Sequence, residues 1–252
     1  METSRYLSCL RHDAARLRTV AEGHLDDRVP SCPEWTVADL VRHVAVVYQH
    51  KTHCIRLGEK PQPWPPDLSK EEPLALLESS LADLLKEFEA HEPTDHVWTW
   101  YPPDQSVGFW IRRMAQETVI HRVDAELAAG EVTAAPDDLA VDGIDEVLSI
   151  FLGWDSFDTL ERAGPGEWPG LESADGQVVR IAAGGDAWSV RPTPAGLEVS
   201  SGGTDEAAAV VTGEPVDVLL WLWRRGDDHR LSVAGDRNLV EFLHAQMAHA
   251  TQ

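Results

Sequence analysis

The residues Glu117 and His121 have the types and the spacing of two metal ligands. They are four residues apart in a segment, Ser106 to Ala129, whose sequence predicts a helix. Side chains at this spacing share one helix face, with Cβ atoms about 5–6 Å apart. The same face carries apolar side chains above and below the pair: Trp110, Met114 and Ala125. We therefore expect the carboxylate and the imidazole to point inward, where a buried carboxylate needs a partner.

A third ligand must come from another helix, and His43 is the candidate. Thr36 and Asp39 have the spacing of a capping box at the start of a second helix, and Gly58 is placed to end it. His43 lies on the flank of the apolar stripe of this helix. Two histidines and one carboxylate match a catalytic zinc site whose fourth position is left for water or substrate, and they also fit non-haem iron. The alternative is a chance pair of polar residues on a solvated helix.

Asp124 could orient one of these ligands, because it follows His121 by three residues. Its carboxylate could accept a hydrogen bond from the imidazole nitrogen that does not bind metal, and such a contact fixes the tautomer of a metal-bound histidine. The other interpretation is an ordinary surface aspartate.

Other reactive side chains have simpler explanations. Cys54 lies three turns from His43, about 16 Å along the helix, and cannot share a metal ion with it. Cys32 has no histidine beside it in the sequence, so an inert thiol is expected. The helix continues through His50 and His53, for which solvated positions are a sufficient explanation.

Aromatic residues and arginines gather around the Glu117 segment. The aromatic residues could line a ligand cleft or form the core of a long connection: Trp98, Trp100, Tyr101 and Trp110. The arginines could meet substrate carboxylates or form solvated salt bridges: Arg112, Arg113 and Arg122.

The composition is that of an acidic globular protein. The chain has 252 residues, enough for one large domain or two ordinary ones, and a formal net charge of −22. This charge disfavours nucleic acid as a partner, because a phosphate backbone would be repelled. The start lacks a signal-peptide pattern, and no apolar run approaches the roughly 20 residues of a membrane span. Together with only three cysteines, these features predict a cytoplasmic protein with no membrane partner.

Apolar periodicity divides the chain into a helical part and a mixed part. Four amphipathic segments with two long connections predict a four-helix bundle: residues 4–23, 36–58, 69–88 and 106–129. Ser69 and Glu72 have the spacing of a capping box for the third of these helices. A fifth helix is expected from Pro136, and the Gly/Pro-rich run 155–170 suggests a domain boundary.

The remainder has the texture of a small α/β domain. Short runs between glycine-rich turns predict strands at 178–182, 187–191, 196–200, 208–212 and 231–233. Helices are expected at 216–224 and 237–249. The predicted fold class is therefore α + α/β, with a helical bundle over residues 1–155 and a mixed α/β domain over residues 156–252.

Several stretches together form a recognisable combination. They are Val29 to His43, Glu117 to Glu126, and the tail segments 213–225 and 233–236. The combination resembles the mycothiol-dependent maleylpyruvate isomerase family, one of the DinB-like metal-binding bundles, over essentially the whole chain. Glu34 departs from the family pattern, in which glycine is frequent at this loop position, without touching the proposed ligands.

This resemblance implies a DinB-like bundle followed by a small C-terminal domain. It also implies a divalent metal, typically Zn²⁺, held by His43, Glu117 and His121. The cosubstrate would be mycothiol, the low-molecular-weight thiol of actinobacteria. The family's isomerase is thought to use an arginine of its C-terminal domain, for which the alternatives here are Arg224, Arg225 and Arg237.

The leading hypothesis is an enzyme that activates a thiol at the metal. The metal would bind the thiol sulfur and lower its pKa, and the thiolate would attack a small electrophilic substrate, giving S-transfer or cis–trans isomerisation. The alternative is a module that binds a metal or a small ligand without turnover, since carriers and enzymes share pocket chemistry. A third interpretation is a metal-free interaction protein.

Overall fold

The computed structural model describes residues 1–164, 167–202 and 206–251. The chain forms two compact units, Met1–Thr133 and Ala134–Gln252. Among the described residues, no helix combines the length and the apolar character that crossing a membrane requires.

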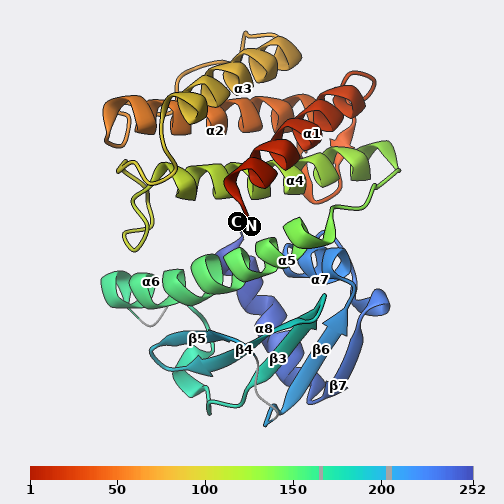
Figure 1. Ribbon diagram of the computed structural model, residues 1–252. Coiled ribbons are helices and arrows are strands. Elements are labelled where there is room, and N and C mark those ends of the chain that lie inside the picture. The colour runs from red at the N-terminus through yellow and green to blue at the C-terminus, as the bar shows by residue number, and fades with distance from the viewer. Residues whose placement is uncertain (165–166, 203–205, 252) are drawn as a thin grey trace. The chain divides into compact units, whose positions relative to one another are not determined.

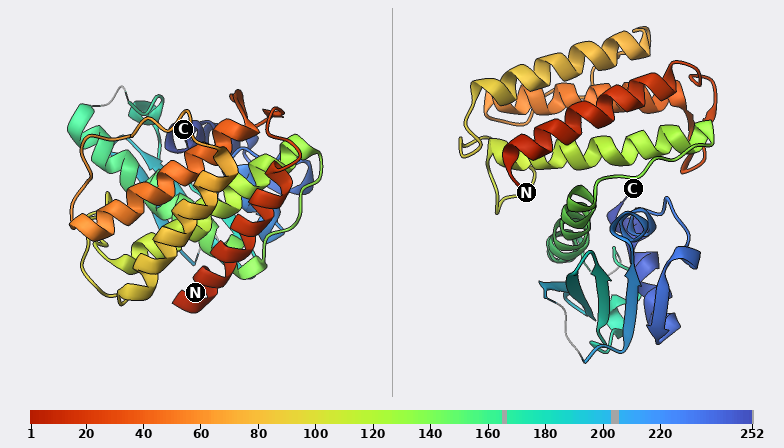
Figure 2. Two further views of the ribbon diagram at one scale, coloured as in Figure 1. Left: turned by 90° about the horizontal axis from the view of Figure 1, so that it is seen from above. Right: turned by 45° about the vertical axis from the view of Figure 1, so that its right-hand side comes forward.

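The first unit is a four-helix bundle, as predicted. Its helices lie side by side (Figures 1 and 2): α1 (Thr3–Ala21), α2 (Val37–Leu57), α3 (Pro73–Ala90) and α4 (Val107–Ala129). Helix α4 packs against α1 and α2, and α2 also packs against α3. The predicted loop between α1 and α2 contains two short antiparallel strands, β1 (Arg28–Val29) and β2 (Cys32–Thr36).

The helix ends follow mostly from local sequence. The Thr36–Asp39 capping box is confirmed, and Gly58 ends α2 in the left-handed conformation at φ 69°. The prediction for α3 is wrong: Glu72, and not Ser69, is the N-cap, and its carboxylate accepts hydrogen bonds from the first-turn amides. The reason is Pro73, which has no N–H and fits the first helical position.

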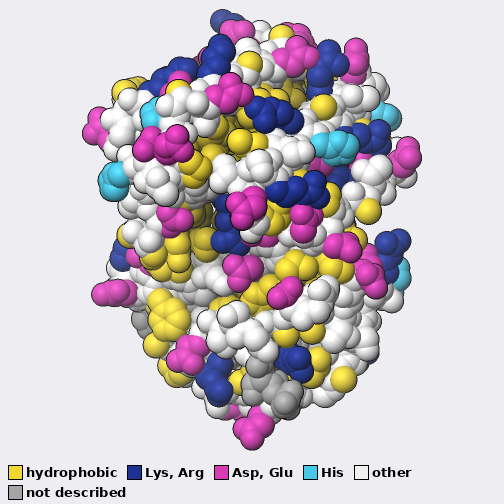
Figure 3. Space-filling view, viewed as in Figure 1, with side chains coloured by type: hydrophobic (Ala, Val, Ile, Leu, Met, Phe, Trp, Pro, Cys, Tyr) yellow, Lys and Arg dark blue, Asp and Glu magenta, His cyan; other side chains and the backbone are white. Residues whose placement is uncertain are grey.

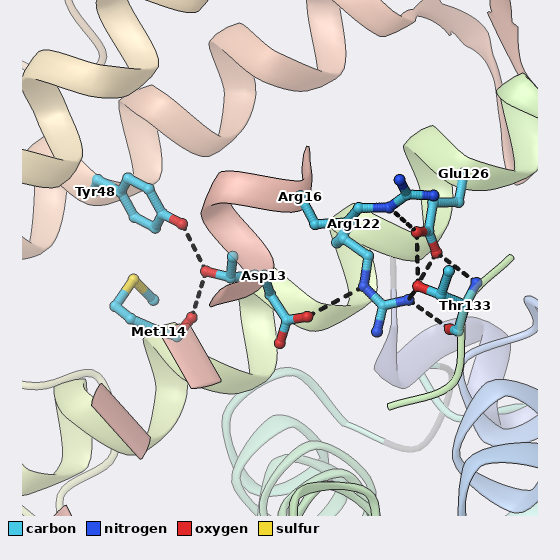
Figure 4. Close-up of polar contacts among 8 residues, drawn as sticks. Asp13, Arg16, Tyr48, Met114, Arg122, Glu126 and Thr133 are labelled. Carbon is cyan, nitrogen blue, oxygen red and sulfur yellow. Dashed lines mark hydrogen bonds and ion pairs between the residues drawn. The ribbon is translucent and has the colours of Figure 1, made fainter. Parts of the chain in front are cut away.

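Helix α4 is buried on nearly all sides, so its polar side chains need partners inside the bundle. Figure 4 shows one such network between α1 and the C-terminal half of α4. Arg122 donates from Nε to Asp13 Oδ1 at 3.2 Å and from Nη1 to Glu126 Oε2 at 2.7 Å. Arg16 donates to the other oxygen of Glu126 at 2.7 Å, and the Thr133 hydroxyl also donates to it. These contacts tie α1 to α4 and to the end of the first unit.

The second unit is a mixed sheet with helices. Its strands run in the order β5-β4-β3-β6-β7, with β3 and β6 parallel and the other neighbours antiparallel. Their bounds are β3 (Val179–Ala183), β4 (Asp186–Thr193), β5 (Gly196–Ser201), β6 (Ala209–Gly213) and β7 (Ser232–Gly235). This confirms the five predicted strands and the α + α/β fold class.

The helices of the second unit pack above this sheet and along one of its faces (Figure 1). Helix α8 packs against β3 and β6, and α7 packs against β6. The helical bounds are α5 (Asp137–Glu146), a π-helical segment (Val147–Trp154), α6 (Asp155–Ala163), α7 (Pro215–Leu222) and α8 (Arg237–Ala250), with short 3₁₀ turns at Leu171–Ser173 and Asp228–Arg230.

The division between the units lies earlier in the chain than the sequence suggested. It falls between Thr133 and Ala134, so α5 belongs to the second unit and not to the bundle. Helix α5 packs against α7, and the indole of Trp188 on β4 donates a hydrogen bond to Asp145 at 3.0 Å. The expected break from residue 155 begins instead as helix α6, because the first glycine of that run is Gly164, with φ at 94°. Residues 165–166 of the run lie outside the described residues.

Candidate metal centre

The structure brings together the three residues that the sequence nominated as ligands. His43 is presented by α2, and Glu117 and His121 by α4. Each offers one ligand atom, and the three atoms all lie within 4.8 Å of one another. Glu117 Oε1 is 3.5 Å from His43 Nε2 and 3.2 Å from His121 Nε2. The two imidazole rings are nearly perpendicular, at 76°, with centroids 5.0 Å apart.

These distances fit a shared divalent ion. In a tetrahedral zinc site with bonds of about 2.0–2.1 Å, neighbouring ligand atoms are about 3.3 Å apart. The distances from Glu117 Oε1 to the two histidine Nε2 atoms lie on either side of that value. Because both histidines direct Nε2 toward the same carboxylate oxygen and the three ligand atoms lie within 4.8 Å of one another, one ion could contact all three side chains once the ligands move closer together.

Asp124 contacts the ring nitrogen of His121 that does not face Glu117. Its Oδ2 lies 2.9 Å from His121 Nδ1, and its side chain is fully buried, so the interpretation as a surface aspartate is wrong. The hydroxyl of Ser31, in the loop before α2, donates to Asp124 Oδ1. The proton on His121 is thus directed to Nδ1, which leaves Nε2 as the ligand atom. No pattern in the sequence gave Ser31 a role; its only signal was its place in the Val29 to His43 stretch.

The charges of the centre stabilise one another without a metal. Burial opposes charge on Glu117, but His121, His43 and Arg113 outweigh it and hold the pKa of Glu117 well below its usual range. Burial also opposes charge on His121, yet Glu117 and Asp124 raise its pKa to about 9. Arg113 donates to Glu117 Oε2 at 2.8 Å, which leaves Oε1 to face the histidines.

One side of the centre is accessible. The His43 side chain is 36% exposed, against 11% for His121. A cavity of about 630 Å³ lies beside His43. It is lined by α2, β2 and the proline-rich segment that connects α2 to α3, including Trp35, Arg42 and Ser69. This volume is within the range of small-molecule sites.

Other residues that the sequence suggested as functional candidates lie in different parts of the structure. Arg122 belongs to the buried network with Asp13, so the solvated interpretation is wrong for it. Cys54 is buried and lies near His50 of the same helix, with Sγ 3.5 Å from Nδ1. The C-terminal alternatives all belong to the second unit: Arg224, with φ at 61°, Arg225, which donates to the Trp223 carbonyl, and Arg237 at the start of α8.

The aromatic cluster before α4 packs around Phe109 and Trp110. Trp100 and Tyr101 pack on Phe109, with centroids 5.3 and 5.7 Å away. Trp98 lies instead beside Trp110, which donates its indole N–H to the Trp98 carbonyl. Phe109 and Trp110 are buried, with ring centroids 5.1 Å apart, and the half-buried Trp98, Trp100 and Tyr101 pack around them.

Comparison with known proteins agrees with this architecture. The mycothiol maleylpyruvate isomerase N-terminal domain matches residues 7–126, and the MDMPI C-terminal domain matches residues 138–242. A search of curated proteins gives no match. Two solved structures share the fold over 93% of both chains: a mycothiol-dependent maleylpyruvate isomerase (TM-score 0.60, 16% identity) and a histidine-to-alanine mutant with the same name (TM-score 0.58, 15% identity). Since the two domain models together span most of the sequence, in the order in which the two units occur, the chain belongs to the mycothiol-dependent maleylpyruvate isomerase family.

Proposed function

We propose that this protein is a metal-dependent enzyme that uses mycothiol to isomerise, or to form an S-conjugate of, a small electrophilic substrate. The observation that carries the proposal is the convergence of His43, Glu117 and His121, whose ligand atoms lie within 4.8 Å of one another. The similar solved structures are named as mycothiol-dependent maleylpyruvate isomerases, which favours isomerisation over transfer.

The three ligands would leave a fourth position for the cosubstrate. When bound, a divalent ion such as Zn²⁺ would act as a Lewis acid that lowers the pKa of a thiol and makes a thiolate available at neutral pH. Two contacts would hold the metal ligands in position. Asp124 would keep the proton of His121 on Nδ1, and Arg113 donates a hydrogen bond to Glu117 Oε2. The more exposed His43 would border the path by which the substrates enter.

Isomerisation of a substrate with a cis double bond would proceed by reversible addition of the thiolate. The mycothiol thiolate would add to one alkene carbon, and the electron pair of the π bond would move onto the substrate's conjugated carbonyl. Rotation about the new single bond and expulsion of the same thiolate would give the trans product and regenerate mycothiol. No net oxidation or reduction is required.

The metal content of untagged protein, purified without chelator and measured by elemental mass spectrometry, tests the site. We expect about one divalent ion per chain, lost in His121→Ala. His24→Ala is a matched control, because His24 is an exposed histidine outside the centre and should leave the metal in place. The absence of metal in the wild type, together with no thermal stabilisation by added zinc, would refute the site.

Turnover separates an enzyme from a binding module. With mycothiol and maleylpyruvate, the wild type should form the trans isomer, and His43→Ala and Glu117→Ala should be inactive. A protein that binds one metal ion per chain but turns over neither maleylpyruvate nor a model electrophile would be a binding module. Full activity in either variant would contradict the proposed ligands.

A further inference from the structure

Lys51 is a mostly buried cation that the proposed metal centre does not use. It lies on α2, with Nζ 4.8 Å from the ring centroid of Trp110 on α4. Within the described part of the chain, its one hydrogen-bond contact is with His50 Nδ1, at 3.2 Å. Among the residues that the structure describes, Lys51 forms no ion pair with a carboxylate. Glu117 acts on the amine only through space. Burying an ammonium group without a hydrogen-bonded anionic partner is unfavourable, and such groups are concentrated at functional sites.

The close neighbours of the Lys51 amine are a neutral imidazole and an aromatic ring. Burial and the charge of Lys51 lower the pKa of His50 to about 4, so His50 is neutral and accepts the hydrogen bond from the amine. The ring of His50 lies 5.1 Å from the ring of Trp64 and 6.4 Å from that of Trp98, so it is not the solvated histidine that the sequence suggested. The amine thus has an aromatic ring and a neutral imidazole as close neighbours, and an incoming carboxylate would supply the anionic hydrogen-bond partner that it lacks among the described residues.

Both helices place this amine at a similar distance from the metal ligands. Lys51 follows His43 by eight residues on α2, which is about 12 Å at 1.5 Å per residue. Trp110 precedes Glu117 by seven residues on α4, which is about 10.5 Å. Arg113 lies between them on α4 and is bonded to Glu117. A small acid with its reactive carbon near the metal ligands could therefore extend a carboxylate, several carbons away, toward Lys51.

We propose that Lys51, which lies over the ring of Trp110, binds the carboxylate of the electrophilic substrate and gives the enzyme its preference for anionic substrates. The inference rests on the proposed function, because it assumes that the reaction occurs at His43, Glu117 and His121. Lys51 is here a specificity residue, which contacts the unreactive end of the substrate.

The first test is binding, which needs no turnover. We would titrate the zinc-loaded full-length protein with maleate, a dicarboxylate with a cis double bond, by isothermal titration calorimetry. Loss of a charge-assisted hydrogen bond should weaken maleate binding about 10- to 100-fold in Lys51→Met. Lys51→Arg should retain most of the affinity. Lys86→Met, which removes an exposed lysine of α3, should have no effect.

The pH dependence of maleate binding provides a second readout. Burial lowers the pKa of Lys51 to about 8, against the opposing effect of Glu117 and in the same direction as Arg113; His50 and Cys54 are its other titratable neighbours. The amine is charged below this pH, so wild-type affinity should decline as the pH rises past about 8. Arginine stays charged, and Lys51→Arg should lack this decline.

Kinetics then connect the binding site to the reaction. In Lys51→Met, the KM for maleylpyruvate should rise about tenfold or more with little change in kcat, while turnover of the neutral electrophile 1-chloro-2,4-dinitrobenzene should be unaffected. Equal maleate affinity in wild type and a folded Lys51→Met would overturn the inference, as would phosphate binding as tight as maleate with the same dependence on Lys51. If no electrophile is turned over, the proposed function fails, whereas the maleate titration still tests the carboxylate site.

Discussion

Asp124 and Ser31 determine how His121 can act, although neither is placed to bind a metal. The carboxylate of Asp124 lies between the Ser31 hydroxyl and His121 Nδ1, so its position is fixed from two sides. A neutral imidazole with its proton on Nδ1 has its lone pair on Nε2, the atom that faces Glu117. One residue, three positions after the ligand, thereby selects which nitrogen is available.

We expect Asp124→Asn to weaken zinc binding about tenfold, at the lower end of the range for such partners. The amide can still accept a hydrogen bond from Nδ1, and loss of the negative charge also eases deprotonation of His121, which partly offsets the weaker orientation. Competition with a chromophoric chelator at fixed pH measures the affinity. Ser31→Ala keeps the carboxylate and should change it less than about threefold. Unchanged affinity in Asp124→Asn would show that the contact does not orient the ligand.

Helix α4 carries two of the three proposed ligands and also forms the centre of the bundle. Its C-terminal half is fixed to α1 through Arg122, which is 2% exposed and contacts both Asp13 and Glu126 (Figure 4). Burial raises the pKa of Asp13 more than Arg122 lowers it. Loss of Arg122 would therefore leave the buried carboxylates of Asp13 and Glu126 without the positive charge that offsets their burial.

Arg122→Met should lower the free energy of unfolding by about 3 kcal/mol, because it leaves buried carboxylates without their main cation. Protonation of Asp13 would relieve part of the cost. Arg16→Met is the matched control: Arg16 bonds the same Glu126 but is 32% exposed, and its loss should cost at most about 1 kcal/mol. Urea unfolding followed by circular dichroism measures both. An equal loss in the two variants would assign the stabilisation to Glu126 alone.

At the scale of the whole molecule, the proposed metal centre belongs to one of two compact units. All three ligands and Asp124 lie within Met1–Thr133, and the sheet lies within Ala134–Gln252. On the face shown in Figure 3, lysines and arginines are interspersed with aspartates and glutamates. With a net charge of −22, the long-range field is negative and attracts divalent cations.

Zinc should therefore slow amide hydrogen exchange in α2 and α4, which carry the ligands, and leave β3 to β7 unchanged. A ligand that binds only the native state at 100 times its Kd stabilises that state by about 2.7 kcal/mol, which is about 100-fold in exchange rate for amides that open with the bundle. Exchange mass spectrometry with and without zinc measures this effect. His43→Ala should show no response to zinc, and uniform protection of both units would contradict a site confined to the bundle.

The sequence by itself determined the features that depend on neighbours along the chain. The capping residues of α2, the ends of α4 and the inward face shared by Glu117 and His121 all follow from local chemistry and from the 3.6-residue period of a helix. The sequence also nominated His43 as the third ligand from its place on the second helix, and the family resemblance implies the same residue.

Only the tertiary structure decided which distant side chains meet. Ser31 and Asp124 are 93 positions apart, and Asp13 and Arg122 are 109 apart. Lys51 and Trp110 come from helices that approach only in the folded bundle. The assignment of α5 to the second unit likewise depends on its packing against α7, since an amphipathic helix shows in its sequence that one face is buried but not what covers it.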